Sequence, residues 1–320
     1  MIQSGSKIKS NNNFFSSGWI CVNKPMNLSS FDVVRRLKKI FSLNKVGHAG
    51  TLDPLATGIL PIAFGNATKT IPYLVSSKKK YRFTILWGVK TLSHDLEAEI
   101  IEENNFVPTE NNIKKILSNF EGKIFQRPPK YSAVKVDGKR AYNLARKGID
   151  FAINEKKVKL YDIILLDHKN NKTEFSTTVG KGFYIRSLVR DICEKLGVLG
   201  VISSLERYEL GPFSLENTFS LETIEKLVHS APAGMVGGDL LIPLSEVLDD
   251  IPALLISNKE AKRIQQGQSF FNDYLHKNSK LGSEVLLLKD KRPIGLATVG
   301  ENSFKPKKVF SEEIFNLRSI

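Results

Sequence analysis

An eleven-residue segment, HAGTLDPLATG at positions 48–58, constrains the fold of this chain more than any other. Its two glycines and its proline restrict the backbone, and glycine also lets another backbone or a flat ligand approach closely. Leu52 and Leu55 are expected to hold the turn against a core, which leaves Asp53 aimed outward. A carboxylate held in this way can be a nucleophile or a general base. The alternative is a structural turn in which Asp53 caps a backbone amide, and the restrictive residues disfavour it.

Length, composition and cysteine content exclude several classes of protein. The 320 residues suit one large domain and one small one, and 41% hydrophobic with 25% charged residues is typical of globular chains. No apolar run approaches the ~20 residues that span a bilayer, and residues 1–17 read as a loose tail without a signal core. Cys21 and Cys193 lie far apart, and no Cys/His cluster has metal-ligand spacing. We therefore expect a cytoplasmic protein without a metal.

Charge favours a polyanionic partner. The chain has 47 Lys and Arg residues against 33 Asp and Glu residues, a net charge of +14. Residues 126–160 hold ten of these bases and three of the acids, so this ninth of the chain carries +7. Tyr131 and Tyr142 are interleaved with the bases, a mixture typical of loops that grip RNA. A solvated basic surface, with a short helix at 141–146, is the alternative.

Hydrophobic periodicity predicts strands at residues 18–23, 81–88, 157–167 and 172–179, and helices at 31–41 and 109–120. Residues 182–187 are expected to form a strand that runs into a helix at 188–196. On such a strand Tyr184 and Arg186 share a face, where they can stack on a base and fix a carboxylate. An exposed tyrosine beside a solvated arginine is the alternative.

Two further aromatic side chains have competing interpretations. Tyr81 alternates with apolar residues along its strand, so it is either a core residue or part of a site, and periodicity does not choose between them. His48 is either a general base or a hydrogen-bonded structural residue, and it offers a flat ring beside Asp53.

Seven motifs then give the chain a resemblance to a known family. They are GWICVNKP (18–25), GHAGTLDPLATG (47–58), GNATK (65–69), KKYRF (79–83), RPPKYSAVKVDGKRAY (127–142), GFYIRSLVRDI (182–192) and KPKKVF (305–310). Together they resemble the TruB-type pseudouridine synthases, which isomerise uridine 55 in the T-loop of tRNA. The resemblance runs from about residue 18 to residue 308.

The resemblance implies roles for nine residues. Asp53 falls on the catalytic aspartate, Arg186 on the arginine that pairs with it, and Tyr184 on an active-site tyrosine. The candidates for substrate contact are His48, Tyr81, Leu205, Lys24, Tyr131 and Arg146. We expect the charge of Arg186 to lower the pKa of Asp53. The carboxylate then attacks C6 of the base or C1′ of the sugar, or assists formation of a glycal, and the sequence does not choose among these routes. Tyr184 either stacks or accepts a proton at C5.

The resemblance also implies the architecture. It is an α+β pseudouridine synthase fold, with a mixed, mostly antiparallel sheet flanked by helices and a small β-rich PUA-like C-terminal domain. The expected divisions are a flexible tail (1–17), a catalytic domain (18–248) with a thumb loop at about 126–150, and an RNA-binding domain (249–320). A monomer that binds the T-loop and acceptor stem of tRNA, without cofactor, metal, membrane or obligate protein partner, is expected.

The chain also departs from the family pattern. Many relatives carry Arg-Arg-Thr where this chain reads Glu206-Arg207-Tyr208, a change that concerns a basic contact.

Two other functions compete with catalysis: a tRNA-folding factor whose catalysis is dispensable, and a guide-dependent relative of ribonucleoprotein particles.

Overall fold

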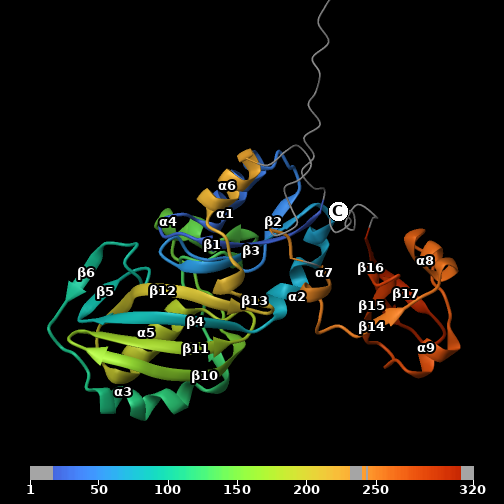
Figure 1. Cartoon of the computed structure of the whole chain (residues 1–320). Coiled ribbons are helices and arrows are strands. Elements are labelled where there is room, and N and C mark those ends of the chain that lie inside the picture. The colour runs from blue at the N-terminus through green and yellow to red at the C-terminus, as the bar shows by residue number, and fades with distance from the viewer. Residues whose placement is uncertain (1–16, 231–239, 243, 311–320) are drawn as a thin grey trace, which may run out of the picture.

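The computed structural model describes residues 17–230, 240–242 and 244–310. The tail predicted at 1–17 lies outside these residues except for Ser17, a buried residue whose hydroxyl accepts a hydrogen bond from the Asn66 amide. Figure 1 shows a large α+β body and, beside it, a smaller β-rich module at the C-terminal end. None of the helices in the described ranges is long and apolar enough to cross a membrane.

One mixed sheet forms the body. Its strand order is β1 (Gly18–Lys24), β3 (Thr57–Phe64), β12 (Gly200–Leu210), β4 (Lys79–Trp87), β11 (Lys172–Val179), β10 (Lys156–Lys169) and β7 (Gly122–Gln126), with β2 (Val46–His48) beside β3 and β13 (Phe213–Ser214) beside β12. Only the β3–β12 pair is parallel among these described pairings. The expected mostly antiparallel sheet is confirmed. Each strand predicted from periodicity is present, apart from the one at 182–187.

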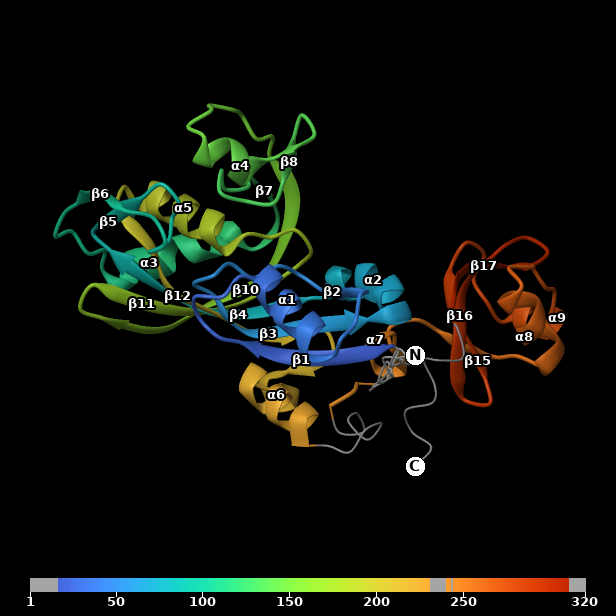
Figure 2. The ribbon, with the colours of Figure 1, turned by 90° about the horizontal axis from the view of Figure 1, so that it is seen from above.

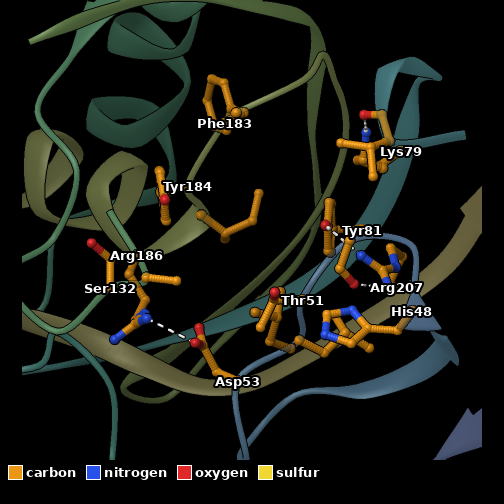
Figure 3. Close-up of a pocket in the computed structure, with 17 residues that line it drawn as sticks. His48, Thr51, Asp53, Lys79, Tyr81, Ser132, Phe183, Tyr184, Arg186 and Arg207 are labelled. Atoms are coloured by element: carbon orange, nitrogen blue, oxygen red, sulfur yellow. Dashed lines mark hydrogen bonds and ion pairs between the residues drawn. The ribbon is translucent and has the colours of Figure 1, made fainter. Parts of the chain in front are cut away.

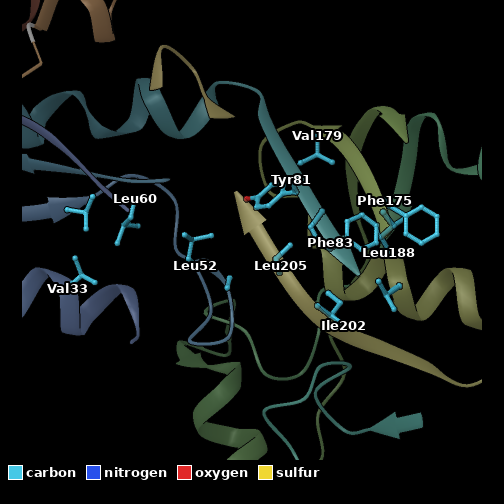
Figure 4. Close-up of a cluster of buried hydrophobic side chains, with 14 of the residues drawn as sticks. Val33, Leu52, Leu60, Tyr81, Phe83, Phe175, Val179, Leu188, Ile202 and Leu205 are labelled. Atoms are coloured by element: carbon cyan, nitrogen blue, oxygen red, sulfur yellow. The ribbon is translucent and has the colours of Figure 1, made fainter. Parts of the chain in front are cut away.

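Helices cover the sheet because their sequences carry one apolar stripe. Helix α1 (Ser30–Ile40) begins at the cap Ser29, which forms a capping box with Asp32, and it buries Val33 and Leu37. Helices α3 (Glu110–Leu117) and α5 (Ile185–Leu196) pack against each other, and α6 (Leu221–Ser230) lies near α1. A 3-10 turn (Gly65–Thr70) leads into the short helix α2 (Ile71–Ser76). Figure 4 shows the core between α1, the sheet and α5.

The expected strand at residues 182–187 is wrong. Helix α5 begins at Ile185, and Tyr184 is its extended N-cap, with φ −118° and ψ 116°. Gly182 has φ +76°, a conformation that breaks a strand. Ile185, Leu188, Val189 and Ile192 follow the helical period and are buried, so the helix starts three residues earlier than expected.

Two smaller groups of elements project from the body. Residues 127–155 connect β7 to β10 and contain the two-residue strands β8 (Lys135–Val136) and β9 (Lys139–Arg140) and the helix α4 (Ala141–Arg146). Figure 2 shows this segment standing above the sheet. The strands β5 (Val89–Thr91) and β6 (Ile100–Glu103) pair beyond the end of β4.

The C-terminal module has its own sheet and core. Strands β14 (Ala253–Leu255), β15 (Glu284–Lys289), β16 (Arg292–Val299) and β17 (Phe304–Val309) are accompanied by the helices α8 (Asn258–Gln265) and α9 (Asp273–Lys277). The rings of Phe270 and Phe304 stack at 5.0 Å in this core. A short helix, α7 (Leu244–Val247), precedes the module. The division of roles at residues 248 and 249 stays a prediction.

Candidate active site

A cavity of about 410 Å³ opens where the loop after β2 faces the start of α5. Its lining comes from six parts of the chain: the end of β2 with the loop after it, Val75 of α2, β4, β12, the segment before and into α5, and Ser132 and Ala133 of the β7–β10 connection. Figure 3 shows Asp53 and Arg186 at one side and Tyr81, Arg207 and His48 at the other. Of the nine expected site residues, the lining contains Asp53, Tyr184, Arg186, His48, Tyr81 and Leu205.

Two buried side chains anchor the Asp53 loop to the body. The Ser30 hydroxyl at the start of α1 accepts a hydrogen bond from the Leu52 amide at 2.8 Å and donates to the Leu52 carbonyl at 3.0 Å. The Lys24 ammonium donates to the carbonyls of Pro25, Leu28 and Pro54. Leu52 is buried as expected. The loop is therefore rigid, and it presents Asp53 from a fixed frame.

Substrate contact by Lys24 is not supported. The side chain has no exposed surface, and its three N–H groups are used by the three carbonyls. Burial lowers the pKa of Lys24 to about 8. Its role in the structure is to support the Asp53 loop from beneath.

Asp53 lies between solvent and a buried arginine. Its Oδ1 accepts a hydrogen bond from Arg186 Nη2 at 2.8 Å, and its side chain is 34% exposed whereas that of Arg186 is 6% exposed. Arg186 also donates to the Tyr131 carbonyl, and its Nη1 lies 3.4 Å from Asp95 Oδ2. One guanidinium thus connects two carboxylates, of which only that of Asp53 is open to the cavity.

The pKa of Asp53 is raised, contrary to the expectation from Arg186 alone. Burial is the largest cause and disfavours the charged form. The charge and hydrogen bond of Arg186 lower the pKa, the charge of Asp95 raises it, and the more distant Lys24 lowers it. Arg186 therefore offsets only part of the cost of holding a carboxylate in this cavity.

Tyr184 is fixed by its backbone. Its amide donates to Gln126 Oε1 at 2.8 Å and its carbonyl accepts from Gln126 Nε2 at 3.1 Å, so the end of β7 is tied to the cap of α5. Burial and then the charge of Asp53 raise the pKa of the Tyr184 phenol. At neutral pH the side chain is therefore a neutral phenol pointing into the cavity (Figure 3).

Tyr81 and Leu205 make the apolar wall. They lie on the adjacent antiparallel strands β4 and β12, are 8% and 7% exposed, and belong to the main core as well as to the cavity lining. Tyr81 is therefore a core residue and a residue of the cavity wall at the same time, so the two interpretations do not exclude each other. The residual exposure is where a flat ligand can rest against the wall.

Arg207 supports this wall from behind. It is buried, and its guanidinium donates to the carbonyls of Ile59 at 2.8 Å and Gly50 at 2.9 Å, with its Nη1 3.5 Å from the Tyr81 hydroxyl. The change to Glu206-Arg207-Tyr208 therefore keeps a buried arginine that connects the Asp53 loop, β3 and Tyr81.

Two polar atoms facing this region have no hydrogen-bond partner. In the described residues, the buried side-chain atoms without one are His48 Nδ1 and Ser132 Oγ, and both residues line the cavity. Burial, and then the charge of Arg207, lower the pKa of His48, so its ring is neutral at neutral pH. Buried unpaired groups are costly and uncommon.

Tyr131 and Arg146 lie outside the cavity lining. Tyr131 contributes its backbone carbonyl to Arg186, and Arg146 is on α4 with its guanidinium 6.0 Å from the Tyr142 ring. Both belong to the basic connection between β7 and β10. Their contact with RNA stays a prediction.

Three residues of the site were missed by sequence reasoning: Asp95, Arg207 and Lys79. Lys79 lines the cavity and donates to the carbonyls of Val75 and Ser77, and burial, then Arg207 and Lys181, lower its pKa to about 8. Lys79 precedes the strand expected at 81–88, and a charged residue at such a position carries no signal of burial. The motif KKYRF marked the position of Lys79 but not its role.

Comparisons with known proteins agree in pointing to one family. A family model described as "TruB family pseudouridylate synthase (N terminal domain)" matches residues 38–185. Two curated relatives carry the name tRNA pseudouridine synthase B. The one from Caulobacter sp. (strain K31) is 43% identical over 79% of this chain and 81% of its own, and the one from Caulobacter vibrioides is 41% identical over 90% and 89%.

Solved structures agree on the fold. A chain of the structure titled "Crystal Structure of a Cbf5-Nop10-Gar1 Complex" superposes with a TM-score of 0.72 at 24% identity, covering 96% of this chain and 88% of that one. A chain of an H/ACA RNP bound to a substrate RNA gives a TM-score of 0.70 at 22% identity, covering 94% and 86%. At these identities the likeness establishes the architecture.

Proposed function

The chain belongs to the TruB family of pseudouridylate synthases, and on this basis we propose that it isomerises uridine 55 in the T-loop of tRNA, with Asp53 as the reacting carboxylate. The observation that carries the assignment of Asp53 is its ion pair with the buried Arg186 at the mouth of a cavity with an apolar wall. Asp53 is the only carboxylate among the described residues that line this cavity.

The reaction needs the target base outside its stack. The bond between C1′ of the ribose and N1 of uracil breaks, the base rotates, and C5 joins C1′, while C5 releases its proton to solvent and N1 takes one up. Extrusion of a base costs a few kcal/mol. Phosphate contacts, and the wall of Tyr81 and Leu205 taking up the ring, supply what offsets this cost.

Asp53 acts in its ionised form. Attack at C6, attack at C1′ and assistance to a departing base all require a carboxylate with negative charge available to the substrate. A raised pKa makes this carboxylate more basic and more nucleophilic than an ordinary aspartate, while the Arg186 guanidinium, 2.8 Å away, orients it. The buried surroundings of Asp53 thus make the carboxylate reactive, and Arg186 positions it.

Tyr184 serves as a packing surface rather than a base in this proposal. Its raised pKa means that a phenolate, the form able to take a proton from C5, is disfavoured at neutral pH. The ring is held at the cap of α5 by Gln126, on the side of the cavity opposite Tyr81 (Figure 3). It is therefore placed to limit how far the rotating base can move.

The remaining elements extend the contact with RNA. Residues 127–155 bring basic side chains over the cavity, and the C-terminal module takes the acceptor stem in the manner of a PUA domain. We further propose that the protein acts in the cytoplasm as a monomer without a protein partner. Pseudouridine formation in a bare tRNA transcript by the purified chain tests this, because a guide-dependent enzyme leaves such a transcript unmodified.

The test of the catalytic assignment is Asp53→Asn. The amide keeps the shape of the side chain but removes the charge, so tRNA affinity should stay within about twofold while turnover falls by at least ~10³-fold, the scale for loss of a nucleophile or general base. Tritium release from C5-labelled uridine in tRNA measures turnover, and filter binding measures affinity. Release at the wild-type rate from protein purified free of other synthases would refute the role of Asp53.

A tRNA-folding factor is the second candidate function, favoured by the net charge of +14. It predicts that refolding of denatured tRNA is accelerated equally by the wild type and by Asp53→Asn. If wild-type single-turnover assays on a T-loop hairpin give no pseudouridine while refolding is accelerated, this second function replaces the first.

A further inference from the structure

A tyrosine between two lysines lies on the body outside the active-site cavity. The Nζ atoms of Lys159 and Lys78 lie 4.1 Å and 4.4 Å from the centroid of the Tyr161 ring. Lys159 and Tyr161 are two residues apart on β10 and so share a face of the strand, and Lys78 comes just before β4. All three side chains are exposed. We call these three residues the Tyr161 cluster.

The cluster lacks carboxylate partners. Within residues 17–230, 240–242 and 244–310, no ion pair involves Lys78, Lys159 or the nearby Lys181. Two bases further along β4 differ, since Lys80 pairs with Glu209 at 2.8 Å and Arg82 lies 3.4 Å from Glu174. The charges of Lys78, Lys159 and Lys181 are uncompensated by any ion pair among the described residues, whereas those of Lys80 and Arg82 are compensated.

The geometry concentrates positive charge. A cation over an aromatic ring gains ~0.5–1 kcal/mol at an exposed site, but two ammonium groups over one ring also repel each other. An anion between or beside them relieves that repulsion. Lys181 is joined to this arrangement through Gly180, whose amide donates to the Lys159 carbonyl at 2.8 Å. Three mutually uncompensated bases on adjoining segments suit a phosphate.

The cluster lies between the active site and the C-terminal module. On one side, Lys79 and Gly182, the chain neighbours of Lys78 and Lys181, line the active-site cavity. On the other side, Lys181 lines a second cavity of about 570 Å³ together with Lys308 of β17. A polyanion that leaves the active-site cavity toward the C-terminal module therefore passes these bases.

We propose that Lys78, Lys159 and Lys181 bind backbone phosphates of the substrate RNA, on the stretch between the nucleotide in the active-site cavity and the part held by the C-terminal module. The Tyr161 ring holds the ammonium groups of Lys78 and Lys159 at a fixed separation. The inference rests on the proposed function for the identity of the polyanion, and the binding measurement that tests it does not depend on catalysis.

The salt dependence of tRNA binding tests the proposal. Each lysine that neutralises a phosphate contributes about 0.7–0.9 to the slope of log K against log salt concentration. The double variant Lys78→Gln, Lys159→Gln should therefore lose about 1.4–1.8 from the slope measured for wild type by filter binding. Its loss of kcat/KM should be carried by KM. An unchanged slope would overturn the proposal.

Two controls make the result specific. Lys115→Gln removes an exposed lysine of α3, which lies by the far end of β10 and has no ion pair among the described residues, and its slope should equal that of wild type. Tyr161→Phe keeps the ring and should bind as wild type does, whereas Tyr161→Leu should bind several-fold more weakly. If Lys115→Gln lowers the slope by as much as each lysine of the double variant does, the overall charge of the protein causes the effect and the site is rejected. A wild type that binds tRNA but forms no pseudouridine would refute the proposed function and leave this test intact.

Discussion

At the scale of single residues, the reactivity of Asp53 is set by neighbours with opposing effects. Burial and Asp95 raise the pKa of its carboxyl, and Arg186 lowers it. Asp95 is itself buried, with 2% of its side chain exposed, and it accepts hydrogen bonds from the Ser93 hydroxyl and the Glu97 amide. The second carboxylate therefore raises the pKa of the first one by its charge, and both carboxylates bind the same arginine.

Asp95→Asn should move the acid limb of the pH profile of kcat/KM to lower pH. Activity requires ionised Asp53 and is lost as pH falls through its pKa. Removing a negative charge that raises this pKa lowers it, so the variant keeps its ionised fraction in more acidic solution. We also expect a loss of ~1–3 kcal/mol in the free energy of unfolding, because a buried partner of Arg186 becomes weaker.

Ser93→Ala is the matched control for this shift. It removes a hydrogen bond to Asp95 but no charge, so its acid limb should coincide with that of the wild type. An acid limb that stays in place in Asp95→Asn, or that moves equally in Ser93→Ala, contradicts electrostatic tuning by Asp95.

The sequence predicted the rigid turn that presents Asp53 better than it predicted the surroundings of this carboxylate. Asp53 could be identified because glycine, proline and leucine at fixed places around it describe a rigid turn, and chemistry then follows from the carboxylate. Asp95 and Arg207 could not be identified, because their roles depend on long-range contacts, 91 residues along the chain from Asp95 to Arg186 and 148 from Ile59 to Arg207. The direction of the Asp53 pKa shift was mispredicted for the same reason, since burial is a property of the assembled fold.

At the scale of elements, the α5 terminus shows what local pattern misses. Residues 182–187 contain aromatic and β-branched side chains and so favour a strand, yet the apolar stripe of α5 continues through Ile185 and tertiary packing decides for a helix. Tyr184 and Arg186 nevertheless line one cavity, because they are the N-cap and a first-turn residue of α5, and this end of the helix borders the cavity. The prediction that Tyr184 and Arg186 lie on the same side was correct, but a helix start and not a strand face brings them together.

Gly58 is the glycine on which the junction of β3 and β12 depends. Its φ is +93°, and a Cβ there would lie 2.3 Å from the Arg207 carbonyl oxygen. Gly58→Ala should therefore cost at least ~2 kcal/mol more in unfolding free energy than Gly138→Ala, whose site has φ +80° but open space. Urea unfolding measures both. Equal losses would show that backbone strain alone, and not the close approach to β12, makes glycine necessary at position 58.

At the scale of the whole molecule, the C-terminal module is fastened to the body by polar and apolar contacts. Glu284 of β15 accepts a hydrogen bond from the Tyr73 hydroxyl of α2 at 2.5 Å and pairs with Lys307 of β17. Lys69 donates to the Val309 carbonyl at 2.8 Å. Apolar residues of the module, including Leu296 and Phe310, join the second core cluster of the body. The position of the module relative to the active-site cavity thus depends on a small set of side chains.

Glu284→Ala tests whether this fastening serves substrate recognition. If the module holds the acceptor stem, loosening it should raise KM for full-length tRNA several-fold and leave KM for an isolated T-arm hairpin within about twofold, since the hairpin has no acceptor stem to hold. Glu301→Ala, which removes the same charge from an exposed turn of the module, controls for the gain in positive charge and should change neither value. A rise in KM of equal size for both RNAs would instead mean that Glu284 acts on the active-site cavity through α2, because only an effect on the shared part of the two substrates reaches both.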